Sequence, residues 1–386
     1  MLMLLCTACG GSDSESDGGG VNDKPTKHQL QINIFTPEHP VVTRSEPVLV
    51  NSKADENVNS MDVWVVVSQA TTHFTAGKVV GHLSLDIANP SSFEGGIYQM
   101  SVNEDFVKEL PKVNVYVTAN VKPSNTGITL TASSSDDAFE NATLSGGYFG
   151  LTPSLTTQVP LEGLPMSGVL KNQEINAIHT PLLSVATPVR VVRAVSKIRF
   201  IFSRSDTGET DQLHINSISL DADMIPEEEY LFLEGPYDTY CKNIKGSTYL
   251  GAQTWSTGLD NIPASTYPAR FAYDPNDPEQ LKGQDYEDLI DRGLLGTDNN
   301  NKPELVELCY YLRESDQQLK GKIYYKIGKD GEEKSTEFKM ASTDNFTRNH
   351  TWIVYGYFTG KETLKISSID VTNWDLKNTE HNVYNW

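Results

Sequence analysis

Apolar and polar residues alternate along much of the chain, and this alternation predicts β-strands. The clearest case is LPKVNVYVTANV (110–121), whose apolar face would carry Val113, Val115, Val117, Ala119 and Val121. A period of two places successive side chains on opposite faces of a strand, so one face would lie on a core. The same alternation predicts strands in HQLQINIF (28–35) and VRVVRAVSKIRFIF (189–202).

The segment LHINSISL (213–220) changes phase within one strand. Leu213 and Ile215 share a face, and Ile218 and Leu220 return to it after one extra residue, which predicts a β-bulge. Three further segments are nearly continuous runs of β-branched and aromatic residues, which favour central strands. They are MDVWVVVS (61–68), GKIYYKI (321–327) and HTWIVYGYF (350–358).

Helix signals are few. Residues 103–110 form one candidate, which Pro111 would stop, and residues 279–292 form another between Pro278 and Gly293. Many strands separated by Gly, Pro, Asn and Asp indicate an all-β fold built from β-sandwiches. Prolines and glycines cluster between residues 161 and 188, and the strand pattern restarts beyond them. We therefore expect an N-terminal domain over 28–185 and a C-terminal domain over 186–386.

The N-terminus carries the most specific local signal. A short apolar run ends in Thr7 and Ala8 and is followed by Cys9, as in a bacterial lipoprotein signal, although the usual basic residues are missing. Residues 1–8 would be the remnant of a signal peptide, and Cys9 would carry the lipid. Residues 9–27, rich in Ser, Gly and acidic residues, would be a flexible tether. A disordered start with an incidental cysteine is the alternative.

Composition excludes several classes of protein. The chain has 386 residues and a formal net charge of -20. The negative potential of such a protein repels phosphate backbones, so nucleic acid is not an expected partner. Beyond the short N-terminal run, no stretch approaches the ~20 apolar residues of a membrane span.

Two cysteines remain after Cys9, namely Cys241 and Cys309. They either pair in an oxidising compartment or stay free thiols.

Catalytic and metal-binding motifs are missing from the sequence. It contains no GxSxG elbow, HExxH helix or phosphate-binding loop, and its eight histidines are scattered. We therefore expect no enzyme activity, no catalytic residues, no metal and no cofactor. The aromatic segment YLGAQTWSTG (249–258) is a candidate platform for a glycan, but such aromatics more often fill a core.

Three groups of motifs, in order, resemble the fimbrillins of Bacteroidetes, the subunits of type V pili. The first is LQINIF (30–35), then Arg44, then MDVWVVVS (61–68). The second is LPMSG (164–168), followed by TPVRVVRAVSKIRF (187–200). The third is TRNHTWIVYGYF (347–358), followed by LKISSIDVTNW (364–374). Together with the lipoprotein start and the strand end at 119–121, they span nearly the whole chain.

The resemblance implies two transthyretin-like domains in a lipoprotein of the outer membrane and cell surface. A trypsin-like protease would cut after Arg44 and release the first strand, residues 28–44, which we expect at a sheet edge with Leu30, Ile32 and Ile34 facing inward. The C-terminus of another pilin subunit would replace it. The donor segment would be 375–386, with Leu376, Val383, Tyr384 and Trp386.

The resemblance leaves three roles open. The chain is either a cleaved shaft subunit that serves adhesion to a host or bacterial surface ligand, or an anchor or tip subunit that keeps its strand. The rival class is a monomeric surface lipoprotein that binds glycans.

Overall fold

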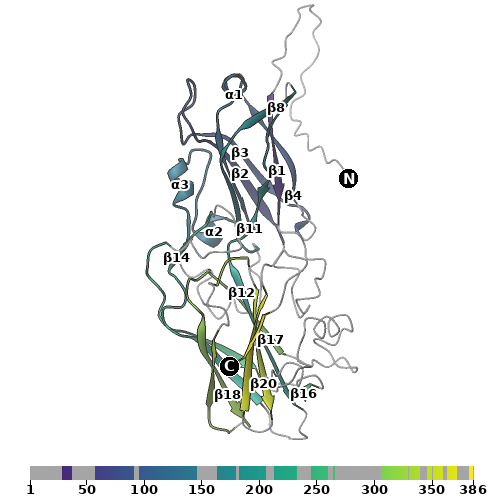
Figure 1. Ribbon diagram of the computed structural model, residues 1–386, viewed down its shortest axis with the longest axis vertical. Helices are drawn as coiled ribbons and strands as arrows, with labels where there is room; N and C mark the ends of the chain where they lie inside the picture. Colours follow the sequence, from purple (N-terminus) through teal and green to yellow (C-terminus); the bar gives the residue numbers. More distant parts are fainter. Residues whose placement is uncertain are drawn as a thin grey trace, which may run out of the picture.

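The computed structural model describes residues 28–36, 57–90, 95–145, 163–179, 182–205, 213–232, 245–259, 264–265, 306–328, 330–339, 346–349, 351–359, 363–371 and 382–385. Strands dominate these residues, and they gather into two groups along the long axis of the molecule (Figure 1). The predicted all-β fold is confirmed.

The first group of strands forms two facing sheets. One contains β1 (His28–Phe35), β4 (Gly95–Val102), β8 (Ile175–His179), β9 (Leu182–Val185) and β10 (Val189–Arg190). The other runs in the order β11 (Val192–Arg193), β7 (Met166–Gln173), β5 (Val113–Ala119), β2 (Ser60–Val67) and β3 (Val79–Asp86). Inward side chains of both sheets share one apolar core, so this half is a β-sandwich.

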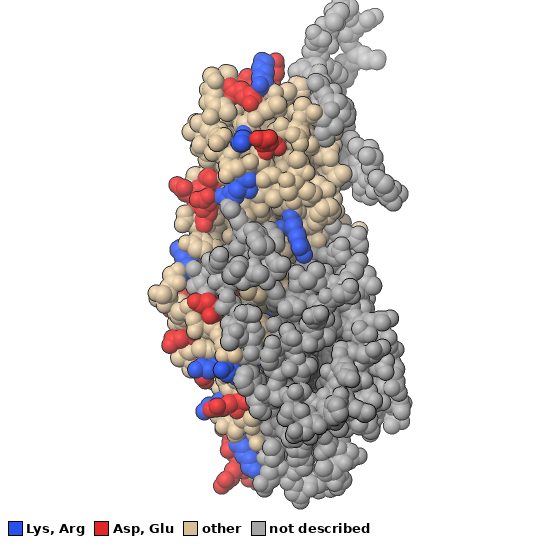
Figure 2. All heavy atoms as spheres, in the orientation of Figure 1, with Lys and Arg blue, Asp and Glu red and all other residues tan. Residues whose placement is uncertain are grey.

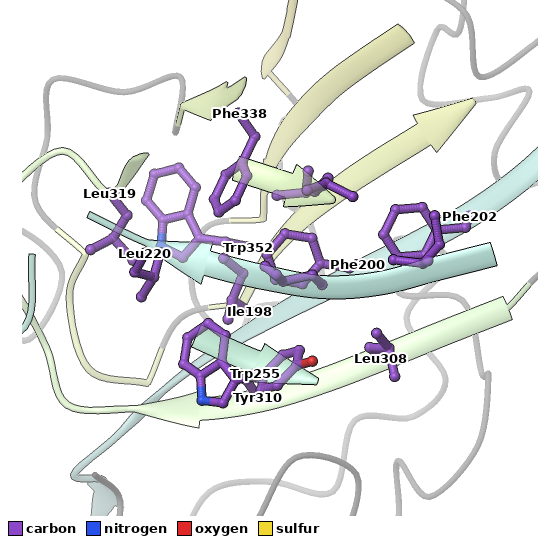
Figure 3. Close-up of a cluster of buried hydrophobic side chains, with 14 of the residues drawn as sticks. Ile198, Phe200, Phe202, Leu220, Trp255, Leu308, Tyr310, Leu319, Phe338 and Trp352 are labelled. Carbon is purple, nitrogen blue, oxygen red and sulfur yellow. The ribbon is translucent and has the colours of Figure 1, made fainter. Parts of the chain in front are cut away.

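The second group forms another pair of sheets. One contains β12 (Ser196–Ser205), β16 (Ala264–Ser265), β17 (Val306–Leu312), β20 (Thr351–Thr359), β21 (Thr363–Val371) and β22 (Asn382–Asn385). The other runs in the order β15 (Gln253–Leu259), β13 (Leu213–Leu220), β18 (Lys320–Ile327) and β19 (Lys334–Lys339). Figure 3 shows the core between them, where Phe200 meets Phe338 edge-on at 5.1 Å between ring centroids.

Helices are short, and the predicted one at 103–110 is confirmed as α1 (Glu104–Glu109). Asn103 caps it by accepting a hydrogen bond from the Phe106 amide at 2.9 Å, and Leu110 ends it in the left-handed region with φ 43°. The others are α2 (Pro123–Thr126) and α3 (Asp136–Glu140). The predicted helix at 279–292 lies outside the described residues.

Two sequence expectations about strands are confirmed and one is incomplete. The runs 61–68, 321–327 and 350–358 become β2, β18 and β20, each paired on both sides. In β13 the pairing register shifts between Ile215 and Ser217 against both neighbours, as a bulge requires. β5 was expected to bury one face, but both are buried, because Tyr116 on the other face stacks on Phe139 of α3 at 4.5 Å between centroids.

The alternation over 189–202 predicts one strand, and this is wrong. The chain forms β10, β11 and β12, which pair with β1, β7 and β20 respectively. The first break falls at Val191, whose amide still donates to the Phe35 carbonyl of β1. The second break, between β11 and β12, has a physical cause: Arg193 is fully buried and donates to Asn349 Oδ1 at 3.1 Å, while the Ala194 amide leaves the strand to donate to the Pro165 carbonyl. The change from the first pair of sheets to the second therefore falls after Arg193, later than the boundary expected between 185 and 186.

A small third pairing joins the two halves. β6 (Thr143–Ser145) lies in the chain between α3 and β7, so it belongs to the first half. It pairs antiparallel with β14 (Glu228–Tyr230), which lies between β13 and β15 and so belongs to the second half. The Leu231 amide extends this contact by donating to the Ala142 carbonyl at 2.8 Å. The halves are thus joined by backbone hydrogen bonds as well as by the covalent chain.

Candidate functional site

The first strand, β1, lies inside its sheet and not at the edge where the sequence placed it. Along its whole length, from His28 to Phe35, it pairs antiparallel with β4. On the opposite side it pairs parallel with β9 at residues 29–31 and with β10 at residues 34–35. The earliest described segment of the chain is therefore held between strands that come much later.

The inward face of β1 is the predicted one. Leu30, Ile32 and Ile34 have 0% exposure and belong to the core that both facing sheets share. Their partners on β4 are Met100, Tyr98 and Gly96. Burying three aliphatic side chains contributes about 1.5–3 kcal/mol each, and each ladder hydrogen bond adds about 0.5–1.5 kcal/mol net. Without β1, the sandwich would contain an apolar slot lined by unpaired backbone groups on two sides.

Close backbone packing fixes the shape of this slot. Gly95 has φ +89°, and a Cβ placed on it would lie 2.2 Å from the carbonyl oxygen of Ile34. Only glycine combines that backbone conformation with so close an approach, so the start of β4 can lie this close to β1 only with glycine at position 95. A strand that replaces β1 must therefore bring its backbone equally close to Gly95, and it must carry apolar side chains at alternate positions.

Several predicted site residues fall outside the described part of the chain. These are Cys9, Arg44, Leu376 and Trp386. Val383 and Tyr384 lie in β22, which pairs antiparallel with β21 of the same chain, opposite Ile369 and Ser368. Residues 382–385 of the expected donor segment therefore form a strand, which lies last in the described order of its own sheet.

The motif LPMSG is a structural joint whose positions each have a physical role. Leu164 and Met166 are fully buried. Ser167 donates its hydroxyl to the Leu231 carbonyl at 2.6 Å. A Cβ on Gly168 would lie 2.4 Å from the Arg190 carbonyl oxygen, so only glycine lets β7 approach the end of β10 this closely.

Asn120, at the strand end 119–121, explains another part of the resemblance. It is fully buried in the left-handed region, with φ 57°. Its Oδ1 accepts from the Asn59 amide at 2.7 Å, and its Nδ2 donates to the carbonyls of Asn57 and Leu164 at 2.7 and 2.9 Å. One side chain thus satisfies three backbone groups from two separate segments.

The motif TRNH supplies the charged centre of the junction. Arg348 is fully buried, and its Nη2 lies 2.7 Å from Glu314 Oε1. The same guanidinium donates to the carbonyls of Tyr230 and Leu231 at 2.5 and 2.7 Å. The Arg348 Nε also donates to Glu314 Oε1, at 3.0 Å, and Glu314 Oε2 accepts from the Arg348 amide at 3.2 Å. Because these bonds and the carbonyl acceptors satisfy both charged groups, the burial of the pair is compensated.

A second buried carboxyl lies beside that pair. Glu229 on β14 accepts from the Glu314 amide at 2.9 Å, and its other oxygen has no hydrogen-bond partner among the described residues. Burial raises the pKa of Glu229 from 4.5 to about 8; the Arg348 charge opposes this rise and the Glu314 charge adds to it. Glu229 is therefore a neutral acid over most of the physiological range.

The sequence did not single out Glu229, Glu314 or Arg193 as site residues. The sequence contained only weak signals for them. Arg193 lies inside one apolar strand, and the pair Arg313 and Glu314 directly follows another apolar strand. Such charges usually point to solvent, and only the folded chain brings these three elements together.

The aromatic platform expected as one possibility at 249–258 is not formed by its tryptophan. Trp255 is 1% exposed and lies against Tyr310, with 4.6 Å between ring centroids. Figure 3 shows both rings within the second core. This confirms the core interpretation of that residue.

The described part of the chain gives three further observations. None of its helices is long and apolar enough to cross a membrane. No group of three or more His, Cys, Asp or Glu side chains in it is placed to hold a metal ion. In the view of Figure 2, its acidic and basic side chains lie interspersed, without a large patch of one sign.

Comparisons with known proteins give structural neighbours alone. No protein-family model matches the chain, and no curated protein matches its sequence. A tip fimbrial protein from Porphyromonas gingivalis is similar at 10% identity and a TM-score of 0.47, over 93% of this chain and 100% of that one. A candidate cell adhesion protein from Parabacteroides distasonis has 14% identity and a TM-score of 0.46, over 94% and 96%. A fimbrial assembly protein from the same species has 12% identity and a TM-score of 0.44, over 93% and 98%.

Proposed function

We propose that this chain is a structural subunit of a surface fimbria, that it serves adhesion, and that it assembles by exchange of its first strand. Proteolysis after Arg44 would release β1, and a strand from a neighbouring subunit would fill the slot. The proposal assigns no catalytic role, cofactor or metal to the chain. Its partners are other pilin subunits and the outer membrane, the latter through lipid on Cys9.

The observation that carries this proposal is the position of β1. A strand from the start of the chain fills the gap between β4 and the pair β9 and β10, and its three inward side chains have 0% exposure. Loss of an edge strand would leave one unpaired edge. Loss of β1 would leave two, together with an apolar slot, so the cut protein would have a strong tendency to accept another strand.

The energetics favour a durable replacement. Three buried aliphatic side chains at about 1.5–3 kcal/mol each, with several ladder bonds at about 0.5–1.5 kcal/mol, give a gross gain on the order of ten kcal/mol. Ordering the incoming segment offsets part of that gain. Among the described strands, β8 and β9 would still pair with each other, whereas β4 and β10 pair only with β1, so the slot would share the ordering cost with the donor.

The C-terminal segment is the proposed donor. Of the strands that the structure describes, β22 pairs with β21 alone, over residues 382–385, so few described backbone hydrogen bonds hold it on its own chain. In its own chain, β22 has four paired residues. In a neighbour's slot, the same segment could pair over up to eight residues, as β1 does with β4. Exchange would therefore increase the number of paired backbone groups.

The test uses the full chain and a trypsin-like protease. Wild type should give one early cut after Arg44, followed by oligomers that persist on a gel without boiling. Arg44→Ala should stay monomeric, whereas Arg44→Lys should be cut and should assemble, since trypsin accepts both basic residues. Deletion of 375–386 should allow the cut and block assembly.

Two outcomes would point to other roles. If the wild type resists the cut at Arg44 yet joins filaments of other subunits, the chain is an anchor or tip that keeps β1. If it is cut but both the wild type and the Arg44→Ala variant remain monomers, strand exchange is wrong and a monomeric surface binder is the better description. Attachment of lipid to Cys9 is tested separately by detergent phase partitioning. The Cys9→Ala variant should move the protein from the detergent phase to the aqueous phase.

A further inference from the structure

The outer face of the sheet that contains β1 has an ordered row of uncharged polar side chains. Gln99 of β4 is paired with Gln31 of β1, Gln31 with Ser184 of β9, and Ser184 with Asn176 of β8. These four side chains point away from the core, because side chains alternate along a strand and the neighbouring residues are buried in the core. Those neighbours are Leu30, Ile32, Leu183 and Ile175. At a strand spacing of about 4.8 Å, the row is about 14 Å long.

Charge is nearly missing from this face. Its other outward residues on β1 and β4 are Gln29, Asn33, Phe35, Ser101, Ile97 and Gly95, none of which is charged. Among the described strands of the sheet, the one permanent charge on this side belongs to Arg190, opposite Phe35 at one corner. In a chain with a net charge of -20, a face of this composition is unusual.

The polar groups of the row have spare hydrogen-bonding capacity. Among the described residues, the side chains of Gln31, Gln99, Ser184 and Asn176 make no hydrogen bonds with one another or with other groups, and Gln99 and Asn176 are exposed. Each amide offers two donors and an acceptor, and the serine hydroxyl both donates and accepts. This matches a ligand whose groups also donate and accept.

Apolar surface adjoins the row. Ile97 is 60% exposed and Phe35 is 50% exposed, and they are two of the few large apolar side chains that the described part of the chain exposes. Ile97 pairs with Asn33, and Phe35 lies two residues further along β1, so both lie on the same outward face as Gln31. The face thus combines an amide row with an apolar border.

We propose that this face, formed by β4, β1, β9 and β8, binds an uncharged polysaccharide. Sugar hydroxyls donate and accept as the amides do, and the C–H faces of the rings pack on Phe35 and Ile97. An anionic glycan or a nucleic acid requires several cations, and the face has one at its corner. A second protein subunit requires a larger apolar centre than two residues provide.

The position of β1 makes this binding dependent on the state of the chain. Gln31 and Phe35 belong to the strand whose removal is proposed above, so this one consequence rests on the proposed function. The uncut chain would bind the polysaccharide, and release of β1 would remove the centre of the row. Binding by the uncut chain itself requires no cleavage.

The experiment measures binding of the uncut full chain, as the Arg44→Ala variant, to an array of neutral mannose, glucose and galactose oligosaccharides with sialylated and sulfated counterparts. Neutral glycans should bind, and the double variant Gln31→Ala, Gln99→Ala should lose at least tenfold in affinity. The control Gln69→Ala removes an exposed amide from outside the sheets, after β2, and should leave binding unchanged. Circular dichroism melts of all three variants would show that each is folded.

Four results would overturn the proposal. They are no binding to any neutral glycan, equal binding by the double variant, a preference for the charged glycans, or concentration-dependent dimers that the double variant abolishes. The outcomes also separate this inference from strand exchange. Glycan binding by the Arg44→Ala variant, with a wild type that is cut but stays monomeric, leaves the inference standing and strand exchange wrong. Assembly of the cut wild type without glycan binding by the variant has the opposite meaning.

Discussion

Ser167 and Arg348 donate hydrogen bonds to the same acceptor, the carbonyl oxygen of Leu231, at 2.6 and 2.7 Å. Ser167 belongs to the motif LPMSG on the first sandwich, and Arg348 belongs to the motif TRNH before β20 of the second. Two motifs that lie far apart in the sequence therefore meet at one backbone atom. Their shared role is to hold the junction between the sandwiches.

Replacing Arg348 should destabilise the protein strongly. Arg348→Ala leaves Glu314 as a buried charge without its partner and frees the carbonyls of Tyr230 and Leu231, at a cost of about 3–5 kcal/mol. Urea unfolding followed by tryptophan fluorescence measures this loss. The matched control is Lys108→Ala, which breaks the solvent-exposed pair with Glu104 and should leave the urea midpoint nearly unchanged. Equal losses in both variants would contradict the role assigned to Arg348.

Glu229 should make stability fall as pH rises. Its folded pKa of about 8 exceeds the ordinary value of 4.5, so the folded state holds a proton that the unfolded state releases between these values. The contribution is fully present below pH 4.5 and is lost as pH rises through 8. Urea midpoints measured from pH 5 to pH 8.5 should therefore decrease in the wild type.

The control variant is Glu229→Gln, which resembles the neutral acid and can still accept from the Glu314 amide. Its urea midpoint should change less with pH than that of the wild type, and it should exceed the wild-type value at pH 8.5. A wild type and variant with the same pH profile would show that Glu229 is not the group responsible.

The sequence predicted elements more reliably than their neighbours in space. Alternation located β1, β5 and β13, and even the bulge near Ile215, because a strand's period is a local property. Pairing is not local, so the sequence placed β1 at an edge when it lies between β4 and β9. Likewise, the run from 189 to 202 has one continuous pattern, but it forms strands of three different sheets, and the buried Arg193 lies at the second of the two breaks.

The candidate site shows the same limit. Leu30, Ile32 and Ile34 could be assigned to a buried face from their spacing, and the structure places them there. The polar row across four strands could not be predicted, because Gln31 and Gln99 are neighbours only through the pairing of β1 with β4. A glutamine at an outward strand position carries no local signal that distinguishes a binding face from ordinary surface.

Asn120 should be irreplaceable at its position for two independent reasons. Asn120→Ala would leave buried backbone groups of Asn59, Asn57 and Leu164 without partners, and alanine tolerates the left-handed conformation poorly. We expect a loss of about 3 kcal/mol or more in urea unfolding. Asn120→Gly keeps the conformation and removes the side chain, so it should lose less than Asn120→Ala; a larger loss would show that the backbone conformation is not part of the cost.

The slot left by β1 should be selective for the side chains that β1 places in it. A synthetic peptide of residues 28–35 added to the freshly cut protein should occupy the slot and inhibit oligomer formation, because it restores the pairing with β4 and the burial of Leu30, Ile32 and Ile34. The same peptide with Ile32→Asp must bury a carboxylate at the centre of the core, so it should not inhibit. A peptide with Gln31→Ala changes only the outward face and should inhibit as the native one does.

This comparison separates recognition by the core from recognition by the backbone. If the slot bound any extended strand through its unpaired edges, the three peptides would inhibit oligomer formation equally. The structure predicts otherwise, since Ile32 has 0% exposure whereas Gln31 is partly exposed on the opposite face of the same strand. Equal inhibition by the Ile32→Asp peptide would therefore refute the slot as the site of exchange, even in a protein that still polymerises after cleavage.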